Sequence, residues 1–279
     1  MDMDQLLTRR RALIAGAAVL GAAGATGTAR VLTAEQAGNA TRPPPAGPRA
    51  RAALTSSAHP LLSMAGDGRP RSRPLRPPVR REPLLHVPGR GRTMVLTFDD
   101  GPDPRYTPSI LKTLREYDVP AMFFVCGKMA AAARNLLAEM ADDGHVVGNH
   151  TWTHPLLTEL RRPRIRSEIE RTCDVIEDAY GARPQWFRAP YGAWNRSVFQ
   201  IGADLGMEPV AWTVDSLDWT TPGTGAVVRR VEHGAAPGVI VLSHDAGGDR
   251  SQTVRALRDY LPRLLDRGYR FTVPRRRYA

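Results

Sequence analysis

The sequence predicts an α/β domain built on a parallel sheet, and three observations support this. Short apolar, β-branched segments alternate with longer amphipathic segments between residues 94 and 273, as expected for parallel strands joined by helices. Polar, reactive side chains recur where the apolar segments end. Residues 93–279 have the length of one domain, and we find no internal repeat.

Seven short apolar segments predict strands, at residues 94–99, 121–126, 146–149, 186–188, 209–214, 239–243 and 269–273. The segments between them predict helices at residues 109–117, 130–143, 163–180, 196–205, 225–233 and 253–267. Pro163 suits the first turn of its helix, and Gly181 suits a helix end.

The first 29 residues have the features of an export signal. Arg9, Arg10 and Arg11 precede residues 12–29, which carry no charge and are rich in Ala and Gly. Consecutive arginines before a mildly apolar stretch favour the twin-arginine route, with an ordinary secretory signal as the alternative. We expect an exported protein, extracellular or associated with the cell wall, and a membrane-anchored form if the signal is not cleaved.

Residues 30–92 are rich in Pro, Arg, Ala and Gly and predict a disordered linker before a catalytic domain at residues 93–279. Up to Arg92 the chain has 15 arginines and 5 acids, whereas the rest has 24 Lys plus Arg against 23 Asp plus Glu. The basic charge therefore belongs to the N-terminal region. This region either contacts anionic wall polymers electrostatically or is a solubilising spacer, and the exported context argues against a nucleic-acid partner.

Two segments indicate a metal site beside a free carboxylate. Asp99 and Asp100 end a predicted strand. Neighbouring residues of a strand point to opposite sides, so one aspartate can bind a cation while the other acts as a base. His150 and His154 are four residues apart and can converge on the same cation, which leaves a position open for water. This ligand set favours zinc, with cobalt, nickel or iron as alternatives.

Three further predicted strands also end in reactive side chains. Arg188 follows one apolar run, Asp215 and Asp218 follow another, and His244 follows a third. In a barrel of parallel strands these ends form one face, where active sites are found.

These segments resemble the five motifs of the polysaccharide deacetylase family, also called the NodB-homology family or carbohydrate esterase family 4. The matching segments, in the family's order, are residues 97–102, 150–154, 188–192, 215–219 and 242–244. Each motif alone is a weak signal, but five in order over about half of the chain are specific. The resemblance implies that the parallel sheet closes into a distorted or incomplete (β/α) barrel of the NodB-homology type.

The resemblance also implies a role for each motif residue. Asp100, His150 and His154 would bind one divalent metal ion. Asp99 would be the general base that takes a proton from the attacking water. Arg188 would hold Asp99 in its orientation.

The remaining motif residues would complete the reaction. The backbone N–H of Tyr191 would stabilise the oxyanion. His244 would protonate the leaving amine, and Asp218 would orient His244. Trp219 and Leu242 would form part of a pocket for the acetyl methyl group.

The resemblance implies hydrolysis of the N-acetyl group of N-acetylglucosamine units. Peptidoglycan is the preferred substrate because of the export signal and the basic N-terminal region, and chitin or its oligosaccharides come second. An O-acetyl esterase acting on xylan or another acetylated polysaccharide is the alternative within the enzyme class. A carbohydrate-binding wall protein without turnover is the alternative from another class. We expect a monomer.

Residues outside the motifs are assigned structural roles. The histidines in this group are His59, His86, His145 and His233. Asp103 and Asp245 are expected to be solvated loop carboxylates, and Trp186, Trp194 and Trp212 to be aromatic residues of the core or the cleft wall. Cys126 and Cys173 are expected to remain two buried thiols rather than a disulfide.

Overall fold

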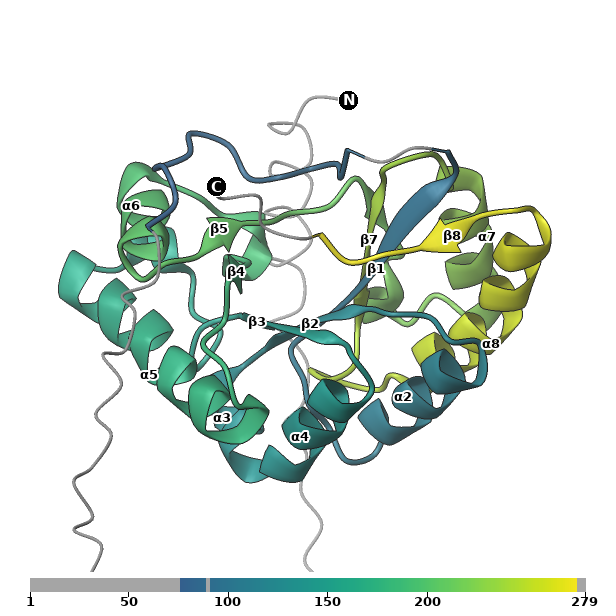
Figure 1. Ribbon diagram of the computed structural model, residues 1–279, viewed down its shortest axis with the longest axis horizontal. Coiled ribbons are helices and arrows are strands. Elements are labelled where there is room, and N and C mark those ends of the chain that lie inside the picture. Colours follow the sequence, from purple (N-terminus) through teal and green to yellow (C-terminus); the bar gives the residue numbers. More distant parts are fainter. Residues whose placement is uncertain (1–75, 89–90, 275–279) are drawn as a thin grey trace, which may run out of the picture. The chain divides into compact units, whose positions relative to one another are not determined.

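A computed structural model of the chain describes residues 76–88 and 91–274 (Figure 1). Its strands are β1 (Thr93–Asp99), β2 (Met122–Val125), β3 (Val146–Asn149), β4 (Trp186–Phe187), β5 (Glu208–Pro209), β6 (Val214–Asp215), β7 (Ile240–His244) and β8 (Arg270–Phe271). Its helices are α2 (Thr107–Glu116), α3 (Gly127–Ala132), α4 (Arg134–Asp142), α5 (Arg162–Tyr180), α6 (Arg196–Asp204), α7 (Thr224–Gly234) and α8 (Ser251–Asp266). Three 3-10 turns cover Leu157–Glu159, Pro190–Gly192 and Asp218–Thr220.

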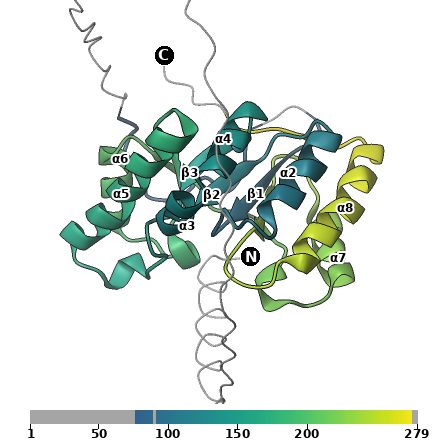
Figure 2. The ribbon, with the colours of Figure 1, turned by 90° about the horizontal axis from the view of Figure 1, so that it is seen from below.

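Within the described residues the strands form one parallel sheet in the order β5-β4-β3-β2-β1-β7-β6, with β8 paired to the start of β1. The sheet is curled, and helices α2, α3, α4, α5, α7 and α8 lie along its outer side (Figures 1 and 2). Strands β5 and β6 stand at the two ends of the order. The fold is therefore an incomplete (β/α) barrel, as predicted.

The period-two pattern of β1 separates an outer core from an inner core. Met94, Leu96 and Phe98 are buried in the core that contains helix residues. Val95 is buried in a second cluster, which also contains Met122, Phe124, Trp186, Val210 and Ile240 from neighbouring strands and the β5–β6 segment. Because side chains alternate along a strand, Thr97 and Asp99 follow Val95 on the inner face. The inner face therefore changes from apolar to polar toward the carboxyl end of the sheet.

Residues 76–88 pack against the domain, although the sequence analysis placed them in the linker. The N–H of Leu84 donates to the carbonyl of Pro209 at 2.8 Å, and the N–H of Val87 donates to the carbonyl of Gly238 at 2.8 Å. Arg80 forms an ion pair with Glu208 at 2.9 Å. These contacts connect the β5 end of the sheet with the start of β7, so the domain begins before Thr93. The export signal and the rest of the predicted linker lie outside the described residues.

Two predicted elements are divided in the structure. The strand predicted at residues 209–214 becomes β5 and β6, because the backbone between them changes partners: the N–H of Val210 donates to Phe187 and the N–H of Thr213 donates to Ile240. The helix predicted at residues 130–143 becomes α3 and α4, because Ala133 leaves the helical conformation with φ −136° and ψ 51°. The other predicted strands and helices are confirmed, with ends shifted by a few residues.

Several structural assignments are confirmed. Cys126 and Cys173 are buried free thiols. His145 is buried and accepts a hydrogen bond from the N–H of Ala121, whereas His86 and His233 are exposed. His59 lies outside the described residues. None of the helices in residues 76–88 and 91–274 is long and apolar enough to cross a bilayer.

Candidate active site

The strand registers bring the motif residues to one end of the inner face. Asp99 is paired with His244 across β1 and β7, and with Phe124 across β1 and β2. Asn149 is paired with Phe187 across β3 and β4. His150 and Arg188 directly follow Asn149 and Phe187. Residues that are up to 145 positions apart in the sequence therefore meet at the same level of the sheet.

Asp100, His150 and His154 form a cluster with the geometry of a metal site. The Oδ1 of Asp100 lies 3.6 Å from Nε2 of His150 and 3.3 Å from Nε2 of His154. Ligand atoms bound at ~2.1 Å in a tetrahedral site are about 3.4 Å apart. Asp100 Oδ1 is buried and has no hydrogen-bond partner among the described residues, which is the state of a carboxylate oxygen reserved for a cation. These residues fit a divalent ion.

A hydrogen bond at Nδ1 of His150, on the side of the ring that faces away from Asp100, leaves its Nε2 free to bind a metal ion. Its Nδ1 lies 2.7 Å from the carbonyl of Arg188 and must donate to it, so the unprotonated nitrogen is Nε2. Burial is the main cause that lowers the pKa of His150 to about 3. His150 is therefore a neutral imidazole with its lone pair directed at the cluster.

The loop that carries the two histidines is held by buried polar side chains. The Oδ1 of Asn149 accepts the N–H of Thr151 at 2.9 Å. Buried Glu168 of α5 accepts the N–H of Trp152 at 3.1 Å and the N–H of Thr153 at 2.8 Å. Because these bonds fix consecutive peptide groups, the spacing of His150 and His154 is set before a cation binds.

Asp99 lies beside the metal cluster and is fixed through one oxygen by Arg188. The Arg188 side chain is 0% exposed, and its Nη1 donates to Asp99 Oδ1 at 2.7 Å and to Thr97 Oγ1 at 2.8 Å. Its guanidinium carbon lies 4.2 Å from the ring centroid of Phe124. The second oxygen, Asp99 Oδ2, lies 3.6 Å from Nε2 of His150. One carboxylate oxygen is thus fixed by the arginine, and the other faces the cluster.

His244 and Asp218 form a buried pair on the opposite side. The Nδ1 of His244 lies 2.7 Å from Asp218 Oδ1, and the backbone N–H of His244 donates to Asp218 Oδ2 at 2.8 Å. Burial acts to lower the pKa of His244, but the charge and hydrogen bond of Asp218, together with the charges of Asp100 and Asp99, raise it to about 9. Burial likewise opposes ionisation of Asp218, but the charge and hydrogen bonds of His244 lower the pKa of Asp218.

Backbone strain is concentrated in the loops that build the site. In the described part of the chain seven non-glycine residues have positive φ, and five of them are in motif segments: Asp100, Thr151, His154, Tyr191 and Leu217. Such conformations cost about 1–3 kcal/mol each and persist only where the surrounding structure enforces them. Asp99 is therefore in regular strand geometry while Asp100 turns away from it, which explains how adjacent aspartates reach different partners.

Tyr191, Leu242 and Trp219 lie around the metal cluster and the His244–Asp218 pair. The Tyr191 ring meets the His154 ring edge-on at 4.6 Å, and Tyr191 is 38% exposed. Leu242 lies in the interior of β7 and is paired with Thr97 and Asp215. Trp219 follows Asp218 in a 3-10 turn and is partly buried. Tyr191 thus stands at the rim of the site, whereas Leu242 lies below His244 on the inner face.

Asp103 and Asp245 are buried, so the prediction that both are solvated is wrong. Asp103 forms an ion pair with Arg105 at 2.7 Å, and the hydrogen bond from Arg105 lowers the pKa of Asp103. Asp245 accepts a hydrogen bond from Thr107 Oγ1 at 2.5 Å. It packs so closely on Gly101 that a Cβ at Gly101 would lie 2.1 Å from Asp245 Oδ2. This close approach requires glycine at position 101.

Glu168, Thr97 and the first turn of α8 were missed by the sequence analysis. Glu168 had a detectable signal, because it is a charged residue on the buried face of α5 between Ile165 and Ile169. Thr253 had none, because threonine is common in helices as in strands. Thr97 lies in the first motif segment, but nothing in the sequence indicated its bond to Arg188. The three tryptophans expected in the core or the cleft wall are packed against other apolar residues. Trp186 is buried, Trp194 stacks on Phe199, and Trp212 packs against the inner core.

A cavity of about 850 Å³ lies away from this site. It is lined by the segment at residues 80–88, by Trp186 and Glu208 at the start of β4 and β5, and by residues 272–274. Trp186 and Glu208 are the first residues of their strands, whereas the motif residues gather at the carboxyl ends.

Comparison with known proteins agrees with this geometry. The family pattern described as polysaccharide deacetylase matches residues 86–210. The chain is 40% identical over 190 residues to the chitooligosaccharide deacetylase of Bradyrhizobium sp. (strain ANU 289), covering 64% of this chain and 87% of that protein.

Solved structures show the same fold. The Bc1960 peptidoglycan N-acetylglucosamine deacetylase superposes with a TM-score of 0.65 at 33% identity, covering 68% of this chain and 89% of that chain. BA3943 from Bacillus anthracis, described as a pseudoenzyme of carbohydrate esterase family 4, superposes with a TM-score of 0.63 at 31% identity, covering 68% of this chain and 66% of that chain. Similarity of fold therefore does not separate active from inactive members, and the site residues have to make that distinction.

Proposed function

Because the chain belongs to the polysaccharide deacetylase family, we propose that it is an exported, metal-dependent hydrolase that removes the acetyl group from N-acetylglucosamine units. The observation that carries the proposal is the convergence of three groups at one end of the inner face. These are the metal cluster around Asp100, the Asp99–Arg188 pair and the His244–Asp218 pair. A carbohydrate-binding protein would not need a base and an acid on either side of a metal cluster.

Asp100, His150 and His154 would hold the ion, and zinc suits one carboxylate and two imidazoles best, with cobalt, nickel or iron as alternatives. When bound, such an ion polarises the acetyl carbonyl and makes water easier to deprotonate. The chain's own residues provide the remaining steps.

Asp99 is assigned as the general base through its Oδ2 atom. Oδ1 is occupied by Arg188 at 2.7 Å, whereas Oδ2 faces the cluster. Arg188 also donates to the carbonyl of Ala211 at 2.9 Å and to Thr97, so it cannot follow a moving carboxylate. Asp99 is thereby held in one orientation for accepting the proton of the attacking water.

His244 is assigned as the acid through its Nε2 atom, because Nδ1 is committed to Asp218. An amide nitrogen is a poor leaving group until it is protonated. Tyr191 is assigned to oxyanion stabilisation through its backbone N–H, and Leu242 and Trp219 to the pocket for the acetyl methyl group.

The substrate class is inferred from the relatives and from the N-terminal region. The relatives named above include a chitooligosaccharide deacetylase and a peptidoglycan N-acetylglucosamine deacetylase. We favour peptidoglycan because the sequence predicts export and carries a basic N-terminal region, which is suited to anionic wall polymers. An O-acetyl esterase acting on another polysaccharide is the second candidate, since the same base and metal cluster would serve an ester.

The test is acetate release from peptidoglycan, chitooligosaccharides and acetylated xylan, each with and without added Zn²⁺ after chelation. We expect metal-dependent release from the N-acetylated glycans and little from xylan. Release from xylan alone would establish the esterase. No release from any substrate by a protein that binds metal would favour the non-catalytic binding protein.

A further inference from the structure

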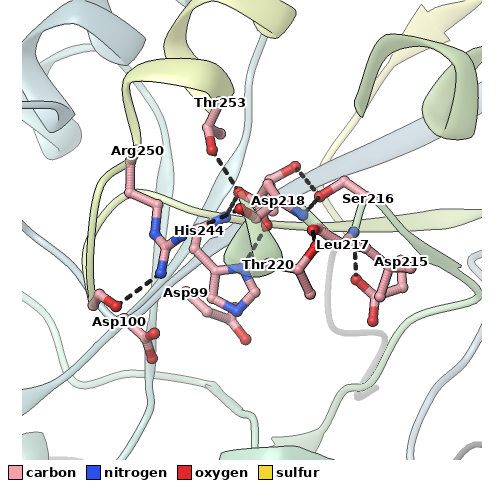
Figure 3. Close-up of polar contacts among 12 residues, drawn as sticks. Asp99, Asp100, Asp215, Ser216, Leu217, Asp218, Thr220, His244, Arg250 and Thr253 are labelled. Carbon is pink, nitrogen blue, oxygen red and sulfur yellow. Dashed lines mark hydrogen bonds and ion pairs between the residues drawn. The ribbon is translucent and has the colours of Figure 1, made fainter. Parts of the chain in front are cut away.

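The Asp218 carboxylate has a third hydrogen-bond partner besides the two atoms of His244. Asp218 Oδ2 accepts a hydrogen bond from the hydroxyl of Thr253 at 2.7 Å (Figure 3). The Asp218 side chain is 0% exposed, and Thr253 is 2% exposed. Water therefore cannot replace the Thr253 hydroxyl without opening the structure.

Thr253 is supplied by the first turn of α8, which is itself anchored to the site. Arg250 immediately precedes α8 and is buried. Its Nε donates to the carbonyl of Ala246 at 2.6 Å, its Nη2 to the carbonyl of Gly247 at 2.8 Å, and its Nη1 to the carbonyl of Asp218 at 3.3 Å. In Figure 3, Thr253 lies above Asp218 and Arg250 lies to the left of the His244–Asp218 pair. The start of α8 is thus tied to the motif segment at residues 215–219 and to the loop that follows His244.

We propose that Thr253 is a positioning residue that acts through Asp218 on His244. Its hydroxyl fixes Oδ2 of Asp218, and the rigid carboxylate then presents Oδ1 to Nδ1 of His244. Without the hydroxyl, Oδ2 keeps only the backbone N–H of His244, and the carboxylate can rotate about its Cβ–Cγ bond. The inference rests on the proposed function in one respect, which is that His244 protonates the leaving amine.

A purely structural role for Thr253 makes a different forecast. If the hydroxyl only stabilised the packing of α8, its removal would reduce all activities of the folded protein equally. If it acts through His244, its removal reduces amide hydrolysis more than hydrolysis of an activated ester, because an aryl alcohol departs without protonation.

The variants Thr253→Val and Thr253→Ser separate these roles, since valine keeps the shape and serine keeps the hydroxyl. Thr113→Val is the matched control. Thr113 is also a buried helical threonine, and its hydroxyl donates a hydrogen bond to the carbonyl of Ser109 at 3.0 Å. The rates to compare are acetate release from N-acetylglucosamine oligomers and hydrolysis of an aryl acetate by the zinc-loaded protein. The Nδ1–H proton of His244, observed by NMR, reports the hydrogen bond without any substrate.

We expect T253V to lower kcat on the oligomers by about 10- to 100-fold, the usual effect of losing an outer hydrogen-bond partner, with KM unchanged. Its loss on the aryl acetate should be several-fold smaller, and the His244 Nδ1–H resonance should shift or broaden. T253S should restore both, and T113V should match the wild type. If T253V does not fold, Thr253→Ala removes the same hydroxyl without placing a methyl group against the Asp218 carboxylate.

Equal losses on both substrates, or an unchanged His244 resonance in T253V, would overturn the inference. Failure of the proposed function has a different signature, because the wild-type protein would then release no acetate while the NMR comparison could still be made.

Discussion

The two sides of the site are held in place by different means. The metal side is built on strained loops, in which Asp100 and His154 have φ values of 76° and 58°. It keeps a buried carboxylate oxygen, Asp100 Oδ1, without a hydrogen-bond partner among the described residues. On the acid side, the Asp218 carboxylate receives hydrogen bonds from His244 and Thr253.

This difference indicates which side a cation would complete. A buried polar atom without a partner costs about 1–3 kcal/mol, so a bound cation would stabilise the metal side. The acid side has its partners within the protein and is complete without an ion. Removal of metal should therefore disable the site without disturbing the His244–Asp218 pair.

The largest effect is expected from removing the ion or one of its ligands. Chelation, or His150→Ala, should abolish acetate release, and H150A should bind far less than one metal ion per chain. The His244 Nδ1–H resonance should remain, because Asp218 does not depend on the cluster. His233→Ala is the control, since His233 is exposed in α7. Metal content near one in H150A would contradict the assignment.

Replacing each of the two adjacent aspartates in turn should separate metal binding from turnover. Asp99→Asn should keep the metal and lose about 10²- to 10⁴-fold in kcat, because the proton acceptor is gone. Asp100→Asn should lose the metal itself. Metal analysis beside kinetics makes the comparison. If both variants lost metal equally, the roles of the two residues would have to be reassigned.

On the acid side, the effect should depend on the leaving group. His244→Ala should nearly abolish acetate release from N-acetylglucosamine oligomers but keep a measurable fraction of activity on an aryl acetate. Asp218→Asn should give a milder version of the same selectivity. An equal fractional loss on both substrates would move His244 to a structural role or to oxyanion stabilisation.

The pH profile tests the same pair. A pKa raised to about 9 keeps His244 protonated at neutral pH, so amide turnover should decline as the pH rises through that value. A bound cation nearby would lower it, so the decline should occur at or below about pH 9. In D218N the decline should move to lower pH, because the charge that raises the pKa is absent while burial still lowers it. An unmoved limb would show that another group controls the profile.

The sequence predicted the metal cluster and the fold better than it predicted the residues that hold them in place. The ligands were detectable because Asp100, His150 and His154 have metal-binding side chains, and the two histidines are four residues apart. Thr97 is bonded to Arg188, which is 91 residues away, and Thr253 to Asp218, which is 35 residues away. No local pattern in the sequence records such pairing. Residues 76–88 were placed in the linker because their contacts with β5 and Gly238 are tertiary and leave no periodicity in a proline-rich segment. The division of residues 209–214 into β5 and β6 also depends on strand pairing, because this segment forms hydrogen bonds first with β4 and then with β7.

Asp245 shows the same limit and gives the last prediction. Sequence reasoning treated it as a solvated loop acid, but burial, together with the charges of Asp100 and Asp99, raises the pKa of Asp245 to about 7. It lies between the two sides of the site, since it follows His244 in sequence and packs on Gly101. Its ionisation is therefore expected to affect stability more than the chemical step.

The sign follows from proton binding. The folded protein keeps the Asp245 proton up to about pH 7, whereas the unfolded chain releases it near the ordinary value of 3.8. Between these values the folded state binds more protons, so the contribution of Asp245 to stability falls as the pH rises from about 4 to 7. Asp245→Asn cannot ionise and keeps an oxygen for Thr107. D245N should therefore gain stability relative to the wild type over this range, by up to about 4 kcal/mol for a shift of about three pKa units.

Denaturant unfolding of both proteins at a series of pH values, with a chelator present, measures this difference. The subtraction cancels groups that the two proteins share, including His150. Asp103→Asn is the control with the opposite cause, because the pKa of Asp103 is lowered: its contribution to stability is fully present above about pH 4 and is lost only as the pH falls. The difference between D103N and the wild type should accordingly be flat from pH 5 to 8, while that of D245N rises toward pH 7. A flat difference for D245N would mean that Asp245 is ionised across the range. Its carboxylate would then be stabilised in the charged form, and the pKa of Asp245 would not be raised.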